Sequence, residues 1–354
     1  MNQNTSRVTP EAATRYCVDL LLHVGLPEAD ANTVARCLVH ADLRGVHTHG
    51  ITRMQVYMER LADGLINPRP DMVVTKPTPV AAHVDGDNAL GFVSATRAMD
   101  EAIAMAGEFG LALAAVNHSN HYGMAASYII QAAEAGFMSF AFSNAPSAMP
   151  AWGGREPLLG TSPFAAGAPM GEGVAPFVLD FTPAITTRGA LRRAVHLGKP
   201  IPEGLALDKE GRPTTDPKAA FEGVVLPMGG PKGSGLAMLM DVMAGVFSGA
   251  GHAGGVADLY GGTRPQDVGH MFMVIRPGLF MTTEDFLARM DVLKKAVHDL
   301  PRAEGFDEVL MPGERGARTE ARYRSEGIPF TEEDIAFLNK TAAQFGTSDI
   351  ELQG

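Results

Sequence analysis

Two histidines and an arginine lie close together near the start of the chain, in the segment His47-Thr48-His49-Gly50 followed by Arg53. If a helix takes in His49, Arg53 lies on the same side of it, because residues four apart share a helix face. Histidine exchanges protons near neutral pH, and the guanidinium fork binds carboxylates. The segment therefore predicts an acid/base, His49, beside a carboxylate clamp, Arg53, with Thr48 orienting the imidazole. The alternative is a helix start at which these side chains provide only a cap and surface charge.

A second polar cluster, Asn117-His118-Ser119-Asn120-His121-Tyr122-Gly123, comes directly after the apolar run 111–116. Polar residues at the end of a buried strand need hydrogen-bond partners, and a ligand site supplies them. His121 precedes a helix and is the best acid/base candidate in this cluster. The alternative is a turn whose Asn and Ser side chains bond only to the local backbone.

A third segment, Gly229-Gly230-Pro231-Lys232-Gly233-Ser234-Gly235, leads into a helix. Glycines around one lysine resemble an anion cradle, in which backbone N–H groups approach a phosphate and the lysine supplies charge. Its glycine spacing is not that of a Walker motif, so a nucleotide pyrophosphate or ribose phosphate is the expected ligand. The alternative is a flexible glycine linker.

Other motifs in the sequence do not support a Rossmann fingerprint, a zinc site or a hydrolase. The segment 249–254 matches G-x-G-x-x-G, but the residues before it are expected to be helical, so the strand that a dinucleotide fingerprint requires is missing. Neither H-E-x-x-H nor C-x-x-C occurs, which argues against a zinc site, and no G-x-S-x-G elbow of a hydrolase is present.

These segments must be positioned by regular elements. Apolar spacing predicts three helices between residues 10 and 61, and the prolines of 65–79 predict an extended connection and a domain boundary. The next elements have the order strand, helix, strand, helix, strand, at 80–84, 93–108, 111–116, 125–135 and 138–143.

The second half of the chain is expected to contain more loop. Residues 145–170 predict a long ordered loop, 199–218 a turn-rich excursion and 249–262 a further loop. Strands are expected at 177–181 and 269–275, and helices at 187–195, 235–247, 282–298 and 332–345. Thr331 is placed to cap the last helix.

Composition limits the class of protein. The chain has 354 residues, 45% of them hydrophobic, which is enough for a sizeable core and about two domains. With 29 basic and 40 acidic residues its net charge is −11, so we expect neither nucleic acid nor a membrane as a partner. Two cysteines, Cys17 and Cys37, fit reduced core thiols, and the N-terminus lacks a secretory pattern, so a cytoplasmic protein is expected.

Taken together, the chain resembles the malate/L-lactate dehydrogenase family, which is unrelated to the Rossmann-type malate and lactate dehydrogenases and also includes ureidoglycolate, sulfolactate and diketogulonate dehydrogenases and piperideine-2-carboxylate reductases. The resemblance spans nearly the whole chain. It is carried by seven ordered stretches: ADLRGVHTHGITR (41–53), VNHSNHYG (116–123), PAWGGREPLLGTSPFAAGAP (150–169), FVLDF (177–181), GKPIPEGLALDKEGRPTTDP (198–217), LPMGGPKGSGLAM (226–238) and VGHMFMVI (268–275).

The resemblance implies roles for individual residues. His49 and His121 would be the acid/base groups, with the proton donor left open between them, assisted by Thr48. Arg53 and Thr161 would bind substrate. The positions implied for NAD or NADP are Asn120, His121, Tyr122, Gly123, Met124, Ala125, Asp180, Phe181, Thr182, Lys232, Pro312, Gly313 and Glu314. No metal ligand is implied.

It also implies a fold and a reaction. The fold is a non-Rossmann α/β arrangement that binds NAD(P), usually as a homodimer. Three regions are expected: a helical domain of 1–75 with 300–354 packed on it, an NAD(P)-binding domain of 76–143 and 250–299, and a loop-rich substrate and dimerisation domain of 144–249.

The implied reaction moves a hydride between nicotinamide and the α-carbon of a small 2-hydroxy or 2-oxo acid, and the alternative is NADPH-dependent reduction of a cyclic imino acid. A catalytically silent nucleotide-binding protein is a third possibility. Thr48 replaces the more frequent serine of the family and keeps its hydroxyl. Asp180-Phe181-Thr182-Pro183 departs from the common D-M-A-T-S pattern, which leaves the cofactor contacts and the choice between NAD and NADP open.

Overall fold

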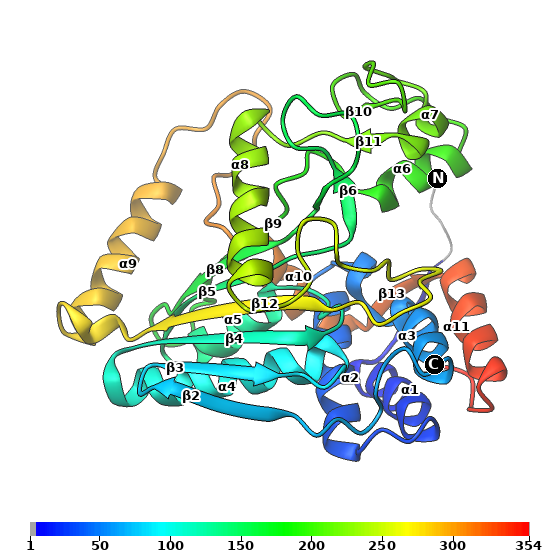
Figure 1. Cartoon of the computed structure of the whole chain (residues 1–354). Helices are drawn as coiled ribbons and strands as arrows, with labels where there is room; N and C mark the ends of the chain where they lie inside the picture. Colours follow the sequence, from blue (N-terminus) through cyan, green and yellow to red (C-terminus); the bar gives the residue numbers. More distant parts are fainter. Residues whose placement is uncertain (1–4, 354) are drawn as a thin grey trace.

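A seven-stranded mixed sheet forms the centre of the molecule in the computed structural model, which describes residues 5–353 (Figure 1). Its strand order is β2-β3-β4-β12-β5-β8-β9, and only β3 and β4 run parallel. The bounds are β2 Val73–Thr78, β3 Ala81–Asp85, β4 Leu111–Ser119, β12 Val268–Ile275, β5 Met138–Ser143, β8 Phe164–Ala168 and β9 Phe177–Phe181.

Helices cover both faces of this sheet. On one face α4 (Gly91–Phe109) contacts β3, β4 and β12, while α5 (Ala126–Glu134) contacts β5, β8 and β9. On the other face lies the end of α8 (Pro231–Met240), which continues as a π-helical turn over Asp241–Val246. Strand β12 is buried on both sides, since Phe272 packs in the α4/α5 cluster and Met271 packs against Ala244 of the π-helical turn.

The two chain ends share a second core. Helices α1 (Pro10–His23), α2 (Glu28–Leu43) and α3 (Met54–Ala62) pack with α11 (Glu332–Gln344), and β1 (Thr5–Val8) pairs antiparallel with β13 (Ile328–Thr331). Figure 1 shows these blue and red segments side by side. This layer confirms the three predicted N-terminal helices. The predicted Thr331 cap is also confirmed, as a capping box with Asp334.

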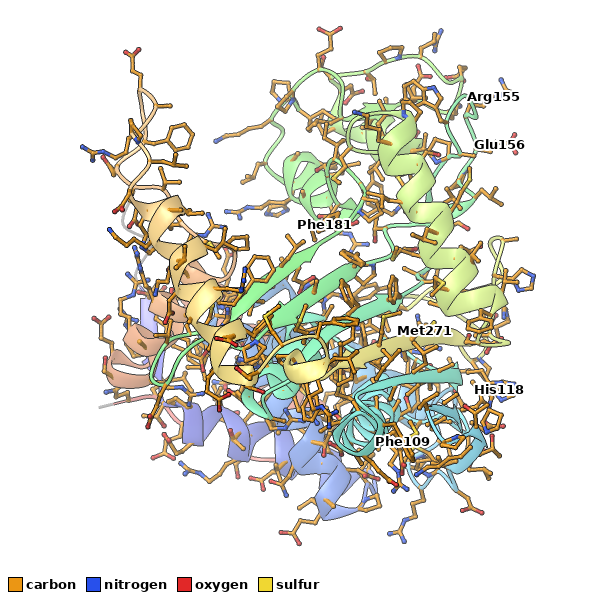
Figure 2. All side chains as sticks on the ribbon, turned by 90° about the vertical axis from the view of Figure 1, so that its left-hand side faces the viewer. Phe109, His118, Arg155, Glu156, Phe181 and Met271 are labelled. Carbon is orange, nitrogen blue, oxygen red and sulfur yellow. The ribbon has the colours of Figure 1, made fainter. Side chains whose placement is uncertain are left out.

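A third, smaller core lies in the loop-rich region above the sheet in Figure 1. Its elements are β6 (Ser147–Met149), β7 (Leu159–Gly160), α6 (Arg188–His196), β10 (Ala206–Leu207), α7 (Pro217–Glu222) and β11 (Val224–Val225). Figure 2 shows Phe181, at the end of β9 in the sheet, near this region, and Arg155 and Glu156 at the end of the region that lies away from the sheet. The division of the chain into three domains stays a prediction, although β8 and β9 extend the sheet past residue 143.

Some local predictions were wrong. Residues 145–170 are not all loop, because β6, β7 and β8 lie there and β8 joins the large sheet beside β5. Strand β4 continues through Ser119, since Asp85 and Val268 on the neighbouring strands pair with Asn117 and Ser119. Helices α9 (Thr283–His298) and α10 (Glu314–Glu326) complete the molecule, and α10 was not predicted. Within residues 5–353 no helix combines the length and apolar character needed to cross a bilayer.

Candidate active site

The two candidate acid/base histidines lie side by side. His49 is in the 3₁₀ turn His47–His49 after α2, and His121 follows β4. Their rings are stacked with centroids 5.7 Å apart and planes 17° apart, and both residues are half-buried. The fold therefore brings both sequence-predicted histidines to one solvent-accessible position.

A buried carboxylate fixes the turn that carries His49. Asp42, at the end of α2, accepts hydrogen bonds of 2.8 Å from Nδ1–H of His47 and from the backbone N–H of Ile51. A Cβ at Gly50 would lie 2.0 Å from this carboxylate, so only glycine fits there. His47 thus supports the turn, while His49, two residues later, reaches the site.

Thr48 and Arg53 surround His49. The Thr48 hydroxyl lies 3.0 Å from Nδ1 of His49. Arg53 donates from Nε to the Thr48 carbonyl at 2.6 Å and from Nη1 to the hydroxyl of Tyr260 at 2.8 Å. No carboxylate in the described part of the chain pairs with Arg53, so its charge is available to a ligand.

His121 is held from three sides. The Tyr57 hydroxyl lies 2.7 Å from its Nδ1, and the backbone N–H of Gly123 points at the same nitrogen from 3.3 Å. Its own backbone N–H donates to the buried Gln266 side chain at 3.0 Å. These contacts fix the ring without using Nε2, which leaves that nitrogen for a ligand.

Burial and one cation set the charge of both histidines. Burial, followed by the nearby Arg53 charge, lowers the pKa of His49 to about 4. Burial, Arg53 and the neighbouring imidazoles hold the pKa of His121 well below its usual value. Both rings are therefore neutral at pH 7, and each can accept a proton or donate a hydrogen bond.

The implied cofactor segment Asn120–Ala125 is rigid. The Asn120 amide donates to the side chain of Asn88 at 2.9 Å and to the carbonyl of Ala89 at 2.8 Å. Tyr122 stacks on the buried His270, whose two ring nitrogens each lie 2.9 Å from a serine hydroxyl. Gly123 has a positive φ of 77°, and the following Met124 and Ala125 are buried.

Asp180, Phe181 and Thr182 lie at the end of β9, against the start of α5. Oδ2 of Asp180 accepts from the N–H of Ala126 at 2.8 Å. Solvent reaches this side chain although protein surrounds most of it, and the loss of water raises the pKa of Asp180 to about 6. The Thr182 hydroxyl donates to the Thr161 carbonyl, which links these cofactor candidates to the substrate candidate.

The Pro312–Glu314 segment lies against the same strand. The Pro312 carbonyl accepts from the N–H of Val178 on β9 at 3.1 Å, and Gly313 packs closely on Val178. Glu314 is paired with His298 at 2.9 Å and with Lys294 at 3.7 Å. The segment thus joins Asp180 at one edge of the sheet.

Lys232 forms no hydrogen bond or ion pair with the other described site residues. It is exposed at the second position of α8 and forms no hydrogen bond or ion pair with the described residues. Gly229 and Gly230 before it have positive φ values of 60° and 63°, so the backbone turns as a cradle would. His118 points elsewhere: it is exposed and pairs with Asp85 at 3.0 Å.

Several contributing residues were not predicted from the sequence. Tyr57 stands four residues after Arg53, so its position on the same helix face was a usable signal. Gln266, Tyr260 and Arg192 come from segments far apart in the chain and carried no signal. In residues 5–353, no three potential metal ligands come together.

The chain is similar to known proteins over most of its length. Residues 8–339 match the family model described as malate/L-lactate dehydrogenase. The chain is 37% identical to L-sulfolactate dehydrogenase of Methanocaldococcus jannaschii over 90% of this chain and 91% of that protein. It is 32% identical to ureidoglycolate dehydrogenase (NAD(+)) of Escherichia coli over 94% and 95%. Identity to (2R)-3-sulfolactate dehydrogenase (NADP(+)) of Chromohalobacter salexigens is 36% over 86% and 88%.

Solved structures have the same fold. The M. jannaschii sulfolactate dehydrogenase superposes with a TM-score of 0.90 at 35% identity, covering 97% of this chain and 98% of that one. Malate dehydrogenase of Pyrococcus horikoshii also gives 0.90, at 31% identity and 98% coverage of both chains. The Δ1-piperideine-2-carboxylate reductase of Pseudomonas syringae gives 0.86 at 27% identity, covering 96% and 100%.

Proposed function

The chain belongs to the malate/L-lactate dehydrogenase family, and from this we propose that it is an NAD(P)-dependent oxidoreductase acting at the α-carbon of a small 2-hydroxy or 2-oxo acid. The observation that carries the proposal is the stacked pair His49 and His121 beside Arg53, which has no carboxylate partner among the described residues. An imidazole can donate or accept the proton, and the guanidinium binds the carboxylate next to the reacting carbon.

The residues of this chain have separate tasks in this reaction. Bound NAD or NADP supplies the hydride acceptor or donor. Arg53, held by the Thr48 carbonyl and Tyr260, orients the substrate through its carboxylate. The two neutral imidazoles face the substrate oxygen, where a proton leaves during oxidation and arrives during reduction. Binding of the anionic substrate offsets the Arg53 charge, and this raises the pKa of both histidines when the proton is needed.

A second arginine favours substrates with two acidic groups. Arg192 of α6 and Arg53 both lie within 5.5 Å of the Tyr260 ring centroid. Arg192 is exposed and has no carboxylate partner in the described part of the chain. Two arginines without carboxylate partners in residues 5–353, in a chain of net charge −11, support a dianionic 2-oxo acid, such as a dicarboxylate or a sulfonated acid.

The cofactor is NAD or NADP, since relatives of both types are named. Asp180 can accept a hydrogen bond from a ribose hydroxyl, because its side chain is exposed to solvent beside the start of α5. Asn120–Ala125, Phe181, Thr182 and Pro312–Glu314 would frame the rest of the cofactor. Lys232, at the start of α8, would supply a positive charge to a phosphate of the cofactor.

An alternative is the reduction of a cyclic imino acid, which the structural similarity to the piperideine-2-carboxylate reductase favours. Both substrates use the same carboxylate clamp. They differ in charge, because the imino acid offers no second acidic group to Arg192.

We further propose a cytoplasmic homodimer. The two cysteines are free and buried, which suits a reducing compartment. Apolar side chains at helical spacing stay exposed along α8 and its π-helical turn, and a second copy would cover them: Met238, Leu239, Val242, Val246 and Phe247.

The test is oxidation of NADH and NADPH with oxaloacetate, sulfopyruvate, pyruvate and piperideine-2-carboxylate. We expect turnover of the dianionic oxo acids, and we expect His49→Ala and His121→Ala each to lower kcat by about 10² to 10⁴-fold. Faster reduction of the cyclic imine would favour the alternative. Cofactor binding without turnover of any substrate would contradict the proposed oxidoreductase activity.

A further inference from the structure

The Tyr57 hydroxyl contacts one of the two ring nitrogens of His121. Its hydroxyl lies 2.7 Å from Nδ1 of His121, and its ring lies 6.1 Å from the imidazole. Tyr57 is almost completely buried on α3, one helical turn after Arg53. The backbone N–H of Gly123 approaches the same Nδ1 from 3.3 Å. One ring nitrogen of His121 therefore faces a hydroxyl and an N–H at once.

Counting hydrogens selects one tautomer. A neutral imidazole carries hydrogen on one nitrogen and accepts at the other. With hydrogen on Nδ1, the Gly123 N–H would face another N–H, and the Tyr57 hydroxyl hydrogen would have no acceptor among residues 5–353. With hydrogen on Nε2, Nδ1 accepts from both Tyr57 and Gly123. Since buried donors are almost always paired, the Nε2–H form fits.

His49 is under no such constraint. Among the described residues, its Nδ1 has one hydrogen-bond partner, the Thr48 hydroxyl at 3.0 Å. A hydroxyl can rotate to donate or to accept. His49 can therefore carry its hydrogen on Nδ1, keep Nε2 free as a base, and become an imidazolium without losing this contact.

We propose that Tyr57 holds His121 as a neutral hydrogen-bond donor to the substrate oxygen, and that His49 alone transfers the proton. This inference rests on the proposed function. In the oxidation, the hydroxyl proton passes to Nε2 of His49 while the Cα–H bond breaks, and its hydride, with both electrons, passes to the oxidised nicotinamide. A C=O bond forms, and His49 later releases its proton to water.

The surroundings of His121 agree with a neutral ring. The titratable or charged groups that face it are Arg53 and Tyr57 around α3, His49 from the turn after α2, and His270 from β12. None is a carboxylate that would stabilise an imidazolium. Loss of the single Nε2 proton would leave an imidazolate, so this histidine is unsuited to act as an acid.

The tautomer is tested on the whole chain, without substrate, by ¹⁵N NMR of its histidines at pH 7. The His121 signals are assigned by their absence in His121→Gln. We expect a protonated Nε2 and an unprotonated Nδ1 in the wild type, and a mixture of tautomers in Tyr57→Phe. Tyr16→Phe is the matched control, because it removes a buried hydroxyl bonded to the Leu338 carbonyl in the same layer. A protonated Nδ1 in the wild type, or wild-type signals in Tyr57→Phe, would overturn the proposal.

Kinetics test the division of roles. His49→Gln should remove the pH dependence of kcat/KM, whereas His121→Gln should lower the rate and keep the pH profile. Tyr57→Phe should lower kcat about tenfold or more with KM changed less than twofold, since Arg53 remains. Loss of the pH dependence in His121→Gln would reverse the assignment. If no substrate is turned over, the proposed function fails, while the NMR result still decides the tautomer.

Discussion

At the scale of single residues, the Arg53 charge links substrate binding to proton transfer. It lies beside both imidazoles and lowers the pKa of each, and its own hydrogen bonds go to a carbonyl and a hydroxyl rather than to a carboxylate. One side chain therefore both attracts the substrate and keeps the free enzyme's histidines neutral.

Arg53→Gln should raise the pKa of His49 from about 4 towards its ordinary value, because one of the two causes of the shift is removed. The KM for the carboxylate substrate should rise about 10- to 100-fold, as expected for losing a charged hydrogen bond. Because His49 acts as a base only when neutral, the acid-side fall of the oxidation rate should move to higher pH. Titration of the His49 Cε1–H signal measures the pKa, with Arg69→Gln as a remote control. An unmoved titration would assign the whole shift to burial.

Arg192→Ala should selectively weaken the binding of dianionic substrates. The guanidinium is exposed, so its contact with a second acidic group is worth little, about two- to fivefold in KM. The ratio of kcat/KM for oxaloacetate to that for pyruvate measures the effect. Arg193→Ala is the matched control, as an adjacent exposed arginine without a partner in the described part of the chain. Equal changes for both substrates would show that Arg192 does not distinguish dianionic from monoanionic substrates.

At the scale of elements, the site depends on short turns between helices rather than on the helices themselves. His49 and Arg53 occupy consecutive 3₁₀ turns between α2 and α3, and Asp42 at the end of α2 ties these turns down. A buried carboxylate with two donors therefore helps to fix two short 3₁₀ turns, which have few backbone hydrogen bonds of their own.

Asp42→Asn should therefore reduce both stability and rate. The amide can still accept from the Ile51 N–H, but it loses the charged hydrogen bond to His47, at a cost of about 1.5–3 kcal/mol in unfolding free energy. Because His49 then loses its fixed orientation, kcat should fall as well. Urea unfolding and steady-state kinetics measure the two effects, with the exposed Glu28→Gln on the same helix as control. Unchanged kcat in a destabilised Asp42→Asn would show that the turn orients His49 without Asp42.

At the scale of the whole molecule, the site lies where the helical layer made by the two chain ends meets the central sheet. His49 and Tyr57 come from that layer, His121 from the end of β4, and Gln266 from the loop before β12. The apolar face of α8 stays uncovered in the single chain. This face is where we expect a second copy.

Val242→Asp should convert the expected homodimer to a monomer, since an unpaired carboxylate at the centre of an apolar contact is costly. Light scattering after size exclusion measures the mass. Val73→Asp, on the exposed edge strand β2, is the control and should keep the dimer. A dimeric Val242→Asp would place the interface elsewhere, and a monomeric wild type would reject the dimer.

The sequence alone determined most of the longer regular elements and the chemistry of single segments. Helix periodicity identified α1 to α3, and the types and spacing of His49, Arg53 and His121 identified the acid/base and clamp candidates, because these signals are local. Short strands such as β6 and β7 were missed, since their pairing partners, not their residues, make them strands. Only the tertiary structure decided that His49 stacks on His121, that Tyr57 reaches Nδ1 and that Arg192 joins Arg53 at Tyr260. The physical reason is that these contacts join side chains from separate elements, so no spacing along the chain encodes them.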